Sequence, residues 1–387
     1  MTGVCLDAEV AVVGAGPAGC HAARRLAERG FRVLLLDRAR FPRVKPCGGA
    51  LSQRALALLP EALRALADTV VDAAELRLGS AAVVRLAADA PVGRLVHRPS
   101  FDLAHLELAA RLPEVEVREG AAVTAAREVG DRVELETAGG TLTARAVVAA
   151  DGAESAVARS LGLAGPRRMA VAVEAEAVLG SAGRSLLFDF AAFPGGYGWV
   201  FAKGAHSSVG GCVVEGPAQG LRGRLEAFWS GLGLSGRPEG VRGARVPMGG
   251  VRLPAAGRRT VLAGDAAGTV DPLTGEGIGG ALESAEMAAA AVDRFLRDGE
   301  PLSAYDRALW RRIHRPMRLA RIAAPRLYRR PEATFRLLLS DRVVGAEFVE
   351  LLRGGRSYGR LVATALLRVV VGRFSAHRGD DLEYSVP

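Results

Sequence analysis

The first forty residues alternate between runs of consecutive apolar side chains and one amphipathic stretch. Residues 8–38, AEVAVVGAGPAGCHAARRLAERGFRVLLLDR, hold an apolar run, a glycine turn, a stretch with apolar positions at helical spacing, and a second apolar run ending at Asp37. Short apolar runs bounded by turns indicate buried strands, and the 3.6-residue period indicates a helix. The pattern therefore predicts a strand, a tight turn, a helix and a second strand.

Further along the chain, apolar and polar residues alternate instead. Residues 115–152 alternate in this way, break at residues 130–131 and 139–140, and end in the apolar run AVVAADG. Alternation interrupted by glycine turns predicts β-hairpins. Strand-like runs continue through residues 165–260, where RMAVAVEAEAV, RSLLFDF and GWVFAKGAHSSVGGCVV predict a largely antiparallel sheet.

The last third of the chain returns to helical patterns. Residues 259–292 contain a strand, a glycine-rich loop and a long alanine-rich helix, and roughly the final 90 residues follow a helical pattern. A chain of 387 residues suits two domains, and no low-complexity linker separates them. We predict an α/β fold (α+β overall) in which a Rossmann-like nucleotide-binding domain interleaves with an antiparallel-sheet substrate domain. The predicted segments are 1–164 and 259–300 for the first domain, 165–258 for the second, and 301–387 for a C-terminal helical basic region.

Composition limits the classes of protein and the cellular compartments that fit this chain. The hydrophobic fraction of 49% and the charged fraction of 24% are ordinary for a globular chain. The four cysteines lie far apart without a CxxC pair, so we expect neither a metal site nor a disulfide framework, and a reducing, cytoplasmic setting fits best. Acidic residues at positions 7 and 9 differ from the basic start of a signal peptide. No uncharged apolar run approaches the roughly 18 residues that span a bilayer.

The net charge of +9 is concentrated at the C-terminus. Residues 301–387 contain 17 arginines against 8 acidic residues. Within them, residues 310–331 and 361–374 mix arginine with aliphatic side chains at roughly helical spacing. Such helices suit an anionic lipid surface at the inner face of the membrane, and an ordinary solvated basic face is an equal alternative. Nucleic acid is a poorer partner, because the stretch has no recognisable binding motif and few aromatics for stacking.

The glycine turn near the N-terminus carries a nucleotide-binding motif. Gly14, Gly16 and Gly19 form GxGxxG between the first strand and the helix. The first glycine makes the turn, the second lets the backbone approach a pyrophosphate, and the third allows close packing of helix and strand. The amides at the helix N-terminus then face the phosphates. Asp37 lies 23 residues beyond Gly14, where a carboxylate can bind ribose hydroxyls. The motif predicts a bound dinucleotide.

Three motifs together resemble the FAD-binding superfamily of the aromatic hydroxylases. They are GAGPAG, the pair Asp151-Gly152, and GDAAG at residues 264–268, in that order. The resemblance implies that Asp265 contacts the ribityl or pyrophosphate part of FAD, and that the loop DPLTGEGIGG faces the pyrimidine end of the flavin. Amides at a helix N-terminus would there stabilise the negative charge of reduced flavin. HRPSFD, with Arg98 and Asp102, resembles the arginine-bearing helix beside the flavin.

Two further segments narrow the resemblance to the geranylgeranyl reductase family, flavoenzymes that saturate double bonds of isoprenoid chains. They are FPRVKPCGGALS, residues 41–52, and GGYGWVFAKG, residues 195–204. The resemblance covers nearly the whole chain, including GGRSYGRL in the tail. It implies that the KxCGG segment borders the flavin and substrate cavity and that the aromatic segment lines a substrate tunnel. Ala202 departs from the family, which usually has Pro there, and the departure concerns the local shape of the tunnel.

The two segments also contain Lys45 and Lys203, the only lysines among 51 basic residues. Arginine and lysine are not interchangeable, so both positions indicate a need for a compact ammonium. We expect them to hold a diphosphate, a lipid headgroup or FAD. Tyr197, Trp199 and Phe201 alternate along a strand and would form one apolar wall for a prenyl chain.

These considerations assign three groups of residues. For FAD binding they are Gly14, Gly16, Pro17, Ala18, Gly19, Asp37, Arg38, Lys45, Cys47, Gly48, Gly49, Arg98, Val123, Asp151, Gly152, Asp265, Gly275, Gly277 and Ile278. For the isoprenoid substrate they are Lys45, Tyr197, Trp199, Phe201 and Lys203. For catalysis they are Cys47, Tyr197 and Trp199, with Cys47 equally interpretable as a small buried side chain.

Several alternatives stay open at this point. One GxGxxG unit leaves no second nucleotide domain, so electrons would come from docked NAD(P)H or from a ferredoxin-like protein. The same FAD motifs serve monooxygenases and halogenases, although only Trp199 matches the halogenase signature cleanly. A non-catalytic flavin- or lipid-binding protein is a third class. The sequence does not identify the headgroup of the substrate, the number of double bonds reduced, the proton donor or the oligomeric state.

Overall fold

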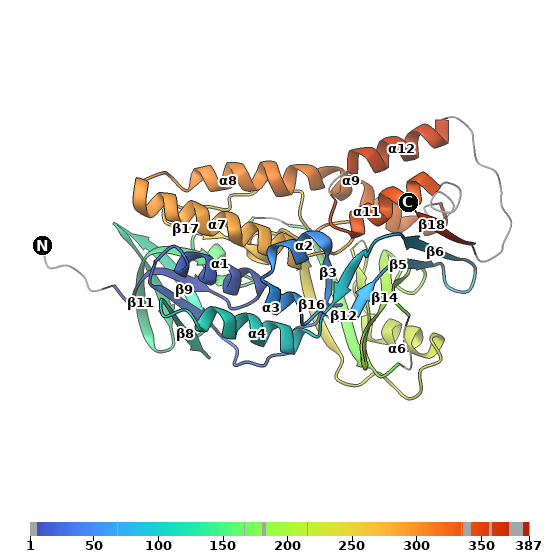
Figure 1. The fold of residues 1–387 in the computed structure, drawn as a ribbon, viewed down its shortest axis with the longest axis horizontal. Coiled ribbons are helices and arrows are strands. Elements are labelled where there is room, and N and C mark those ends of the chain that lie inside the picture. The colour runs from blue at the N-terminus through green and yellow to red at the C-terminus, as the bar shows by residue number, and fades with distance from the viewer. Residues whose placement is uncertain are drawn as a thin grey trace, which may run out of the picture.

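The structure is a computed structural model in which two β-sheets lie end to end beneath a row of long helices (Figure 1). It describes residues 6–386 except residue 68, residue 166, residues 180–182, residue 215, residue 334, residues 336–341, 356–357 and 371–381. Cys5 and parts of the tail segments 354–361 and 361–374 therefore lie outside the described residues.

The predicted β-α-β unit forms the centre of the first sheet. Strand β1 (Ala8–Val13) leads through the glycine turn into helix α1 (Pro17–Ala27). The chain then returns in strand β2 (Val33–Asp37), which pairs in parallel with β1. The strand order is β8-β2-β1-β11-β10-β9, and β17 pairs with β11. The remaining strands are β8 (Val115–Glu119), β9 (Val123–Val129), β10 (Arg132–Thr137), β11 (Gly140–Ala149) and β17 (Thr260–Leu262). The hairpin turns fall at residues 130–131 and 138–139, so the alternating pattern predicted this meander correctly.

The second sheet is largely antiparallel, as its alternating sequence predicts, and its strand order is β16-β12-β15-β14-β13-β5-β6-β18. Its strands are β5 (Ala73–Arg77), β6 (Val83–Ala88), β12 (Met169–Ala177), β13 (Ser185–Asp189), β14 (Gly196–Lys203), β15 (His206–Val213), β16 (Arg242–Pro247) and β18 (Leu382–Val386). Two departures from the predicted segments appear here. Strands β5 and β6 come from the first segment, and β18 shows that the region after residue 300 is not helical throughout.

A small third sheet consists of β3 (Ala50–Ser52), β7 (Gly93–Leu95) and β4 (Thr69–Val71), in the order β3-β7-β4. It contacts the second sheet through β7 and β14, and helix α7 (Ile278–Asp298) through β3. Short helices flank the sheets, and α6 covers one face of the second sheet, where Val173 and Val209 pack against Leu225 and Phe228. These helices are α2 (Gln53–Leu58), α3 (Glu61–Arg64), α4 (Arg98–Ala110), α5 (Ala156–Ser160) and α6 (Leu221–Gly231).

The C-terminal helices span both large sheets. Helix α7 packs on α1 over the first sheet, and α9 reaches β14 of the second sheet (Figure 1). These helices are α7 (Ile278–Asp298), α8 (Ser303–Leu309), α9 (Arg315–Arg329), α11 (Arg342–Leu352) and α12 (Tyr358–Val370), with a π-helical turn at Trp310–His314 between α8 and α9. Within the described residues, no helix combines the length and the apolar character that crossing a membrane requires.

Candidate functional site

The glycine turn before α1 has the backbone geometry that its motif predicts. Gly14 has φ of +96°, a conformation that favours glycine. A Cβ built on Gly19 would lie 1.7 Å from the carbonyl oxygen of Gly14, so only glycine lets helix and strand approach this closely. Gly16 occupies the N-cap of α1 without a side-chain cap, and the first turn contains no acidic residue. The first-turn amides are therefore available to an anion.

Asp37 organises this turn from the end of β2. Its carboxylate accepts hydrogen bonds from the amides of Ala15 at 2.6 Å and Ala39 at 2.7 Å. Arg38 beside it is exposed, and Val123 is half-buried at the start of β9. These positions lie along the edge where parallel strands end, which is where doubly wound sheets bind nucleotides.

The Asp151-Gly152 pair follows β11 and lies against the same turn. A Cβ built on Gly14 would lie 2.9 Å from the Cα of Asp151. Burial raises the pKa of the Asp151 carboxyl, and hydrogen bonds from the first turn of α5 partly oppose this. Its Oδ1 is buried without a hydrogen-bond partner among the described residues. Such an oxygen is a ready acceptor for a ligand or a bound water.

The loop at residues 45–49 connects this nucleotide edge to the second sheet. The Nζ of Lys45 lies 3.5 Å from Oδ2 of Asp265, so two residues predicted from separate motifs meet here. Gly49 has φ of +77°, and a Cβ built there would lie 2.2 Å from the carbonyl oxygen of Val96. A Cβ on Gly48 would lie 2.4 Å from the ring of Phe201. Both glycines are therefore required for this loop to pass between its neighbours.

Lys203 lies at the end of β14 and contacts the loop at residues 45–49. It is buried, its Nζ donates a hydrogen bond to the carbonyl oxygen of Cys47 at 3.2 Å, and it is not among the described residues that line the cavity. The structure thus gives Lys203 a positioning contact with the loop at residues 45–49, and its contact with substrate stays a prediction.

Arg98 and Asp102 form a buried ion pair at the start of α4. The guanidinium donates to both carboxylate oxygens, at 2.9 and 2.8 Å. Burial alone would lower the pKa of Arg98, but the charge of Asp102 and the thiol of Cys47 raise it above its usual value. Burial alone would raise the pKa of Asp102, but Arg98 holds it below its usual range. The pair is charged, and it lies directly behind Cys47.

The loop before α7 approaches the aromatic wall. A Cβ built on Gly275 would lie 2.5 Å from the hydroxyl of Tyr197, and that hydroxyl donates to the carbonyl oxygen of Thr274 at 3.1 Å. Glu276, which the sequence did not single out, folds over the first turn of α7 and accepts the amide of Gly279 at 2.6 Å. The Glu276 carboxylate therefore already accepts a hydrogen bond from one of the helix N-terminal amides that we expected to face the flavin.

The three aromatic residues of β14 form one wall, as their alternation predicts. Tyr197, Trp199 and Phe201 are all buried and all line the cavity. Their ring centroids are 6.3 Å apart for the first pair and 6.4 Å apart for the second. Ala202, where the family usually has Pro, stays in the strand and pairs with Ser207 of β15. The departure thus leaves the ladder of β14 and β15 intact.

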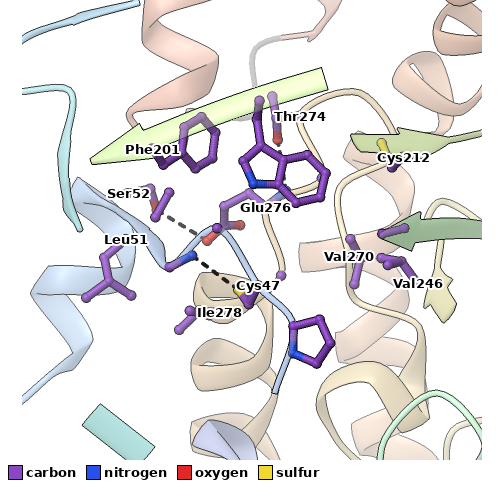
Figure 2. A pocket seen from close by; sticks show the side chains of 18 of the residues that line it. Cys47, Leu51, Ser52, Phe201, Cys212, Val246, Val270, Thr274, Glu276 and Ile278 are labelled. Carbon is purple, nitrogen blue, oxygen red and sulfur yellow. Dashed lines mark hydrogen bonds between the residues drawn. The ribbon is translucent and has the colours of Figure 1, made fainter. Parts of the chain in front are cut away.

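The cavity lies between the nucleotide edge and the second sheet. Figure 2 shows Cys47, Phe201 and Val246 from different elements around it, together with the hydrogen bonds that Ser52 donates to Glu276 and the amide of Gly49 donates to Cys47. The predicted residues that line it are Pro17, Lys45, Cys47, Gly48, Gly49, Arg98, Tyr197, Trp199, Phe201, Asp265, Gly275, Gly277 and Ile278. The other predicted cofactor residues do not line it and lie along the glycine turn, in the first turn of α1, at the ends of β2 and β11 and at the start of β9.

Sequence reasoning missed other residues that line the cavity. Glu174 of β12 lies there, hydrogen-bonded to Ser208 of β15, together with apolar residues of β12, β13 and β16. Period-two alternation places Glu174 on the same strand face as Ala170 and Ala172. Glu176 lies on that face as well, so two carboxylates follow two alanines along it, and this change from apolar to acidic was a usable signal.

The residues present fit FAD. The uncapped N-terminus of α1 suits the diphosphate, the unpartnered Oδ1 of Asp151 offers an acceptor, and the loop at residues 45–49 together with the loop before α7 leads from that end into the cavity. Bound FAD supplies a hydride from its reduced ring, and the chain supplies the binding groups and the apolar cavity. No cluster of His, Cys, Asp or Glu suited to a metal ion occurs in the part of the chain that the structure describes.

Comparison with known proteins agrees with this geometry. Residues 7–183 match the family model described as an FAD binding domain. A menaquinone reductase of Mycobacterium tuberculosis is 35% identical over 319 residues, which cover 74% of this chain and 77% of that protein. A geranylgeranyl diphosphate reductase of Rhodobacter capsulatus is 30% identical over 311 residues, which cover 75% and 76% of the two chains.

Solved structures confirm the predicted fold class. A geranylgeranyl bacteriochlorophyll reductase-like protein of Thermoplasma acidophilum matches with a TM-score of 0.77 at 22% identity, covering 95% of this chain and 96% of that chain. A flavin-dependent brominase matches with a TM-score of 0.73 at 18% identity, covering 94% and 99%. At these identities the solved structures establish the fold alone. The family follows from the relatives at 30% identity or more, whose matches extend over about three quarters of both chains. The chain therefore belongs to the geranylgeranyl reductase family of FAD-dependent oxidoreductases.

Proposed function

We propose that this oxidoreductase saturates C=C bonds in the isoprenoid chain of a lipid-soluble substrate, with a prenylated quinone of the menaquinone type as the first candidate. The observation that carries the proposal is the aromatic wall of β14, which faces the loop at residues 45–49 across one cavity. The 35% identity to a menaquinone reductase supports our choice of a quinone over a chlorophyll, an archaeal-type lipid or a free diphosphate.

The cavity suits an apolar chain better than a polar ring. Tyr197, Trp199 and Phe201 are buried, and Phe188 packs edge-on to Phe201 at 5.3 Å between ring centroids. The hydroxyl of Tyr197 and the indole N–H of Trp199 both donate to groups of the protein, at 3.1 and 2.9 Å. Their rings therefore offer apolar surface, which is how prenyl units gain binding free energy.

The proposal is tested by anaerobic stopped-flow spectroscopy of the dithionite-reduced holoenzyme. Menaquinone, geranylgeranyl diphosphate and a digeranylgeranyl lipid are added separately, and reoxidation of the flavin is followed by absorbance. Reoxidation by one prenyl substrate without oxygen supports the reductase and ranks the headgroups. The main alternative is a monooxygenase or halogenase, whose fold this chain shares. Substrate-dependent reoxidation that occurs only after oxygen is admitted would favour that alternative.

The electron donor belongs to the same proposal. We propose docked NAD(P)H or an acidic ferredoxin-like protein, because among the described residues only the GxGxxG at residues 14–19 joins a strand to a helix of a β-α-β unit, and because the C-terminal region is basic. Mixing the oxidised holoenzyme with NADPH alone distinguishes them. Rapid bleaching of the flavin identifies the nicotinamide, and bleaching only after addition of a reduced ferredoxin identifies the protein donor.

Helix α9 supports a further part of the proposal, contact with an anionic membrane surface. Its outer face carries Leu319 and Ile322, which are 42% and 53% exposed, flanked by Arg315, Arg318 and Arg326. Arginines around exposed aliphatic residues are typical of helices that lie on anionic lipid. The inner face of the same helix carries Tyr328, whose ring lies 5.9 Å from that of Tyr197 in the aromatic wall. We propose that the cavity receives its substrate from the membrane beside α9.

Vesicle flotation tests this contact. The doubly substituted variant L319E/I322E is expected to lose binding to vesicles that contain anionic phospholipid, because each carboxylate removes apolar area and adds repulsion. The control is Val178→Glu, since Val178 is 80% exposed at the end of β12. Equal binding of L319E/I322E and the wild type would contradict the proposal.

A further inference from the structure

The reduction of an alkene requires a proton as well as a hydride, and the cavity contains several titratable side chains. Most of them are unsuited to donate that proton. Arginine does not release its proton. Lys45 pairs with Asp265, and Glu276 pairs with Arg54 at 3.0 Å. Burial raises the pKa of the Tyr197 hydroxyl and raises that of the Cys212 thiol to about 12, so neither is an effective acid. Glu174 and Cys47 remain.

Glu174 is held in a fixed orientation on the cavity face of β12. It is 7% exposed, and the hydroxyl of Ser208 donates to its Oε2 at 2.9 Å. The indole N–H of Trp199 donates in turn to the Ser208 oxygen at 2.9 Å. The same Trp199 belongs to the aromatic wall against which we propose that the prenyl chain lies. The carboxyl is therefore positioned by a hydrogen-bonded chain that ends in the substrate-facing wall.

We propose that Glu174 is the acid that delivers the proton to the substrate alkene. This inference rests on the proposed function. The π bond of the alkene breaks, one carbon receives the hydride that the reduced cofactor supplies, and the other receives the carboxyl proton of Glu174. The resulting carboxylate regains a proton from water before the next turnover. Two electrons restore the reduced cofactor, either as the hydride of one nicotinamide or as two one-electron transfers from an iron–sulfur protein together with a proton from water.

The surroundings of Glu174 favour this role. Burial raises the pKa of its carboxyl, whereas the Lys203 ammonium, the Ser208 hydroxyl and the backbone amide of Cys47 oppose this shift. Arg242 on β16 is the register partner of Glu174, and Glu176 lies two residues along the same strand. A carboxyl whose pKa is raised retains its proton to higher pH, which is the requirement for a general acid.

A matched pair of variants tests the inference. In Glu174→Gln the amide keeps the shape and the contact with Ser208 but provides no acidic proton. In Glu176→Gln the same change is made on the same strand, at an exposed side chain whose carboxylate lies 3.5 Å from His97. Anaerobic reoxidation of the reduced holoenzyme by the prenyl substrate is measured as a function of pH. For the wild type, we expect the rate to fall as pH rises through the pKa of Glu174.

We expect E174Q to slow reoxidation by roughly a hundredfold or more, which is the scale of general acid catalysis, and to remove this pH dependence. E176Q should keep both the wild-type rate and the wild-type pH dependence. E174D, which retains an acid, should keep the pH dependence at a reduced rate and guards against a folding defect in E174Q. A readout independent of turnover is infrared difference spectroscopy of the oxidised holoenzyme between two pH values, in which E174Q should lose one protonated-carboxyl band.

Three outcomes are distinguishable. A wild type that no prenyl substrate reoxidises would refute the proposed function itself. An active wild type with an unchanged rate and pH profile in E174Q would refute the role of Glu174 alone. Loss of the pH dependence in Cys47→Ala, with E174Q unaffected, would assign the proton to the thiol and likewise overturn the inference.

Discussion

Replacement of Arg98 by Met tests the buried ion pair behind the cavity. The pair is bidentate, and its side chains are 5% and 0% exposed. Methionine removes the guanidinium and leaves the Asp102 carboxylate with Arg43, whose Nη2 lies 3.3 Å away. Removing one partner of a buried pair costs about 3–5 kcal/mol, and because Arg43 remains we expect the lower end, about 3 kcal/mol.

The measurement is the free energy of urea-induced unfolding at several pH values. Arg98 holds the pKa of Asp102 below its unfolded value, so in the wild type this stabilisation is present above the unfolded pKa and is lost as pH falls. In R98M the carboxyl pKa should rise, because burial then acts with less opposition. The difference between variant and wild type should therefore be largest near neutral pH and shrink on acidification.

Two further variants make the reasoning refutable. Arg222 and Glu226 form an exposed i,i+4 pair at 3.7 Å, with 72% and 36% exposure, and R222M should cost no more than about 0.5 kcal/mol. The double variant R98M/D102L removes both buried charges and should recover most of the loss. A cost below about 1 kcal/mol for R98M, or a cost that grows as pH falls, would contradict the account.

Three other substitutions address the loop at residues 45–49. Gly48→Ala places a Cβ 2.4 Å from the ring of Phe201, so we expect the free energy of unfolding to fall by about 1–3 kcal/mol and substrate binding to weaken. The control is Gly223→Ala, which has open space around it and should leave the free energy of unfolding unchanged or raise it. Lys45→Met should weaken FAD affinity about two- to fivefold by equilibrium titration, because its ion pair is partly exposed; an unchanged affinity would exclude the contact. Lys203→Met should lower turnover more than it raises substrate KM, since its contact is with the Cys47 carbonyl; a rise in KM alone would instead indicate a contact with substrate.

Local patterns predicted the parts of the fold that depend on local geometry. The GxGxxG turn, the hairpins at residues 130–139 and the single-faced aromatic wall of β14 each follow from a fixed period or from the need for glycine. Pairings between distant segments were not predictable in this way. Strands β5 and β6 joined the second sheet because long-range packing selects partners that no local pattern specifies.

The candidate site also combines residues that local motifs identified with residues whose role depends on contacts between distant segments. The loops that carry Lys45 and Asp265 were identified from separate motifs, and in the structure the two side chains lie 3.5 Å apart. Glu174 was not identified, because its significance depends on Ser208, which lies 34 residues away, and on the Trp199 indole. Lys203 was assigned to substrate because its rarity indicates that lysine is needed, but composition does not say which group the ammonium contacts.

The most direct test of the central claim is the mass of the substrate after anaerobic incubation with the holoenzyme and excess reductant. Menaquinone is incubated, extracted and analysed by mass spectrometry, with FAD-depleted protein as the control. The account predicts a product heavier by two hydrogens in its prenyl chain, formed only by the holoenzyme. An unchanged side chain for every prenyl substrate, or a product that gains oxygen or halogen once air and halide are supplied, would contradict it.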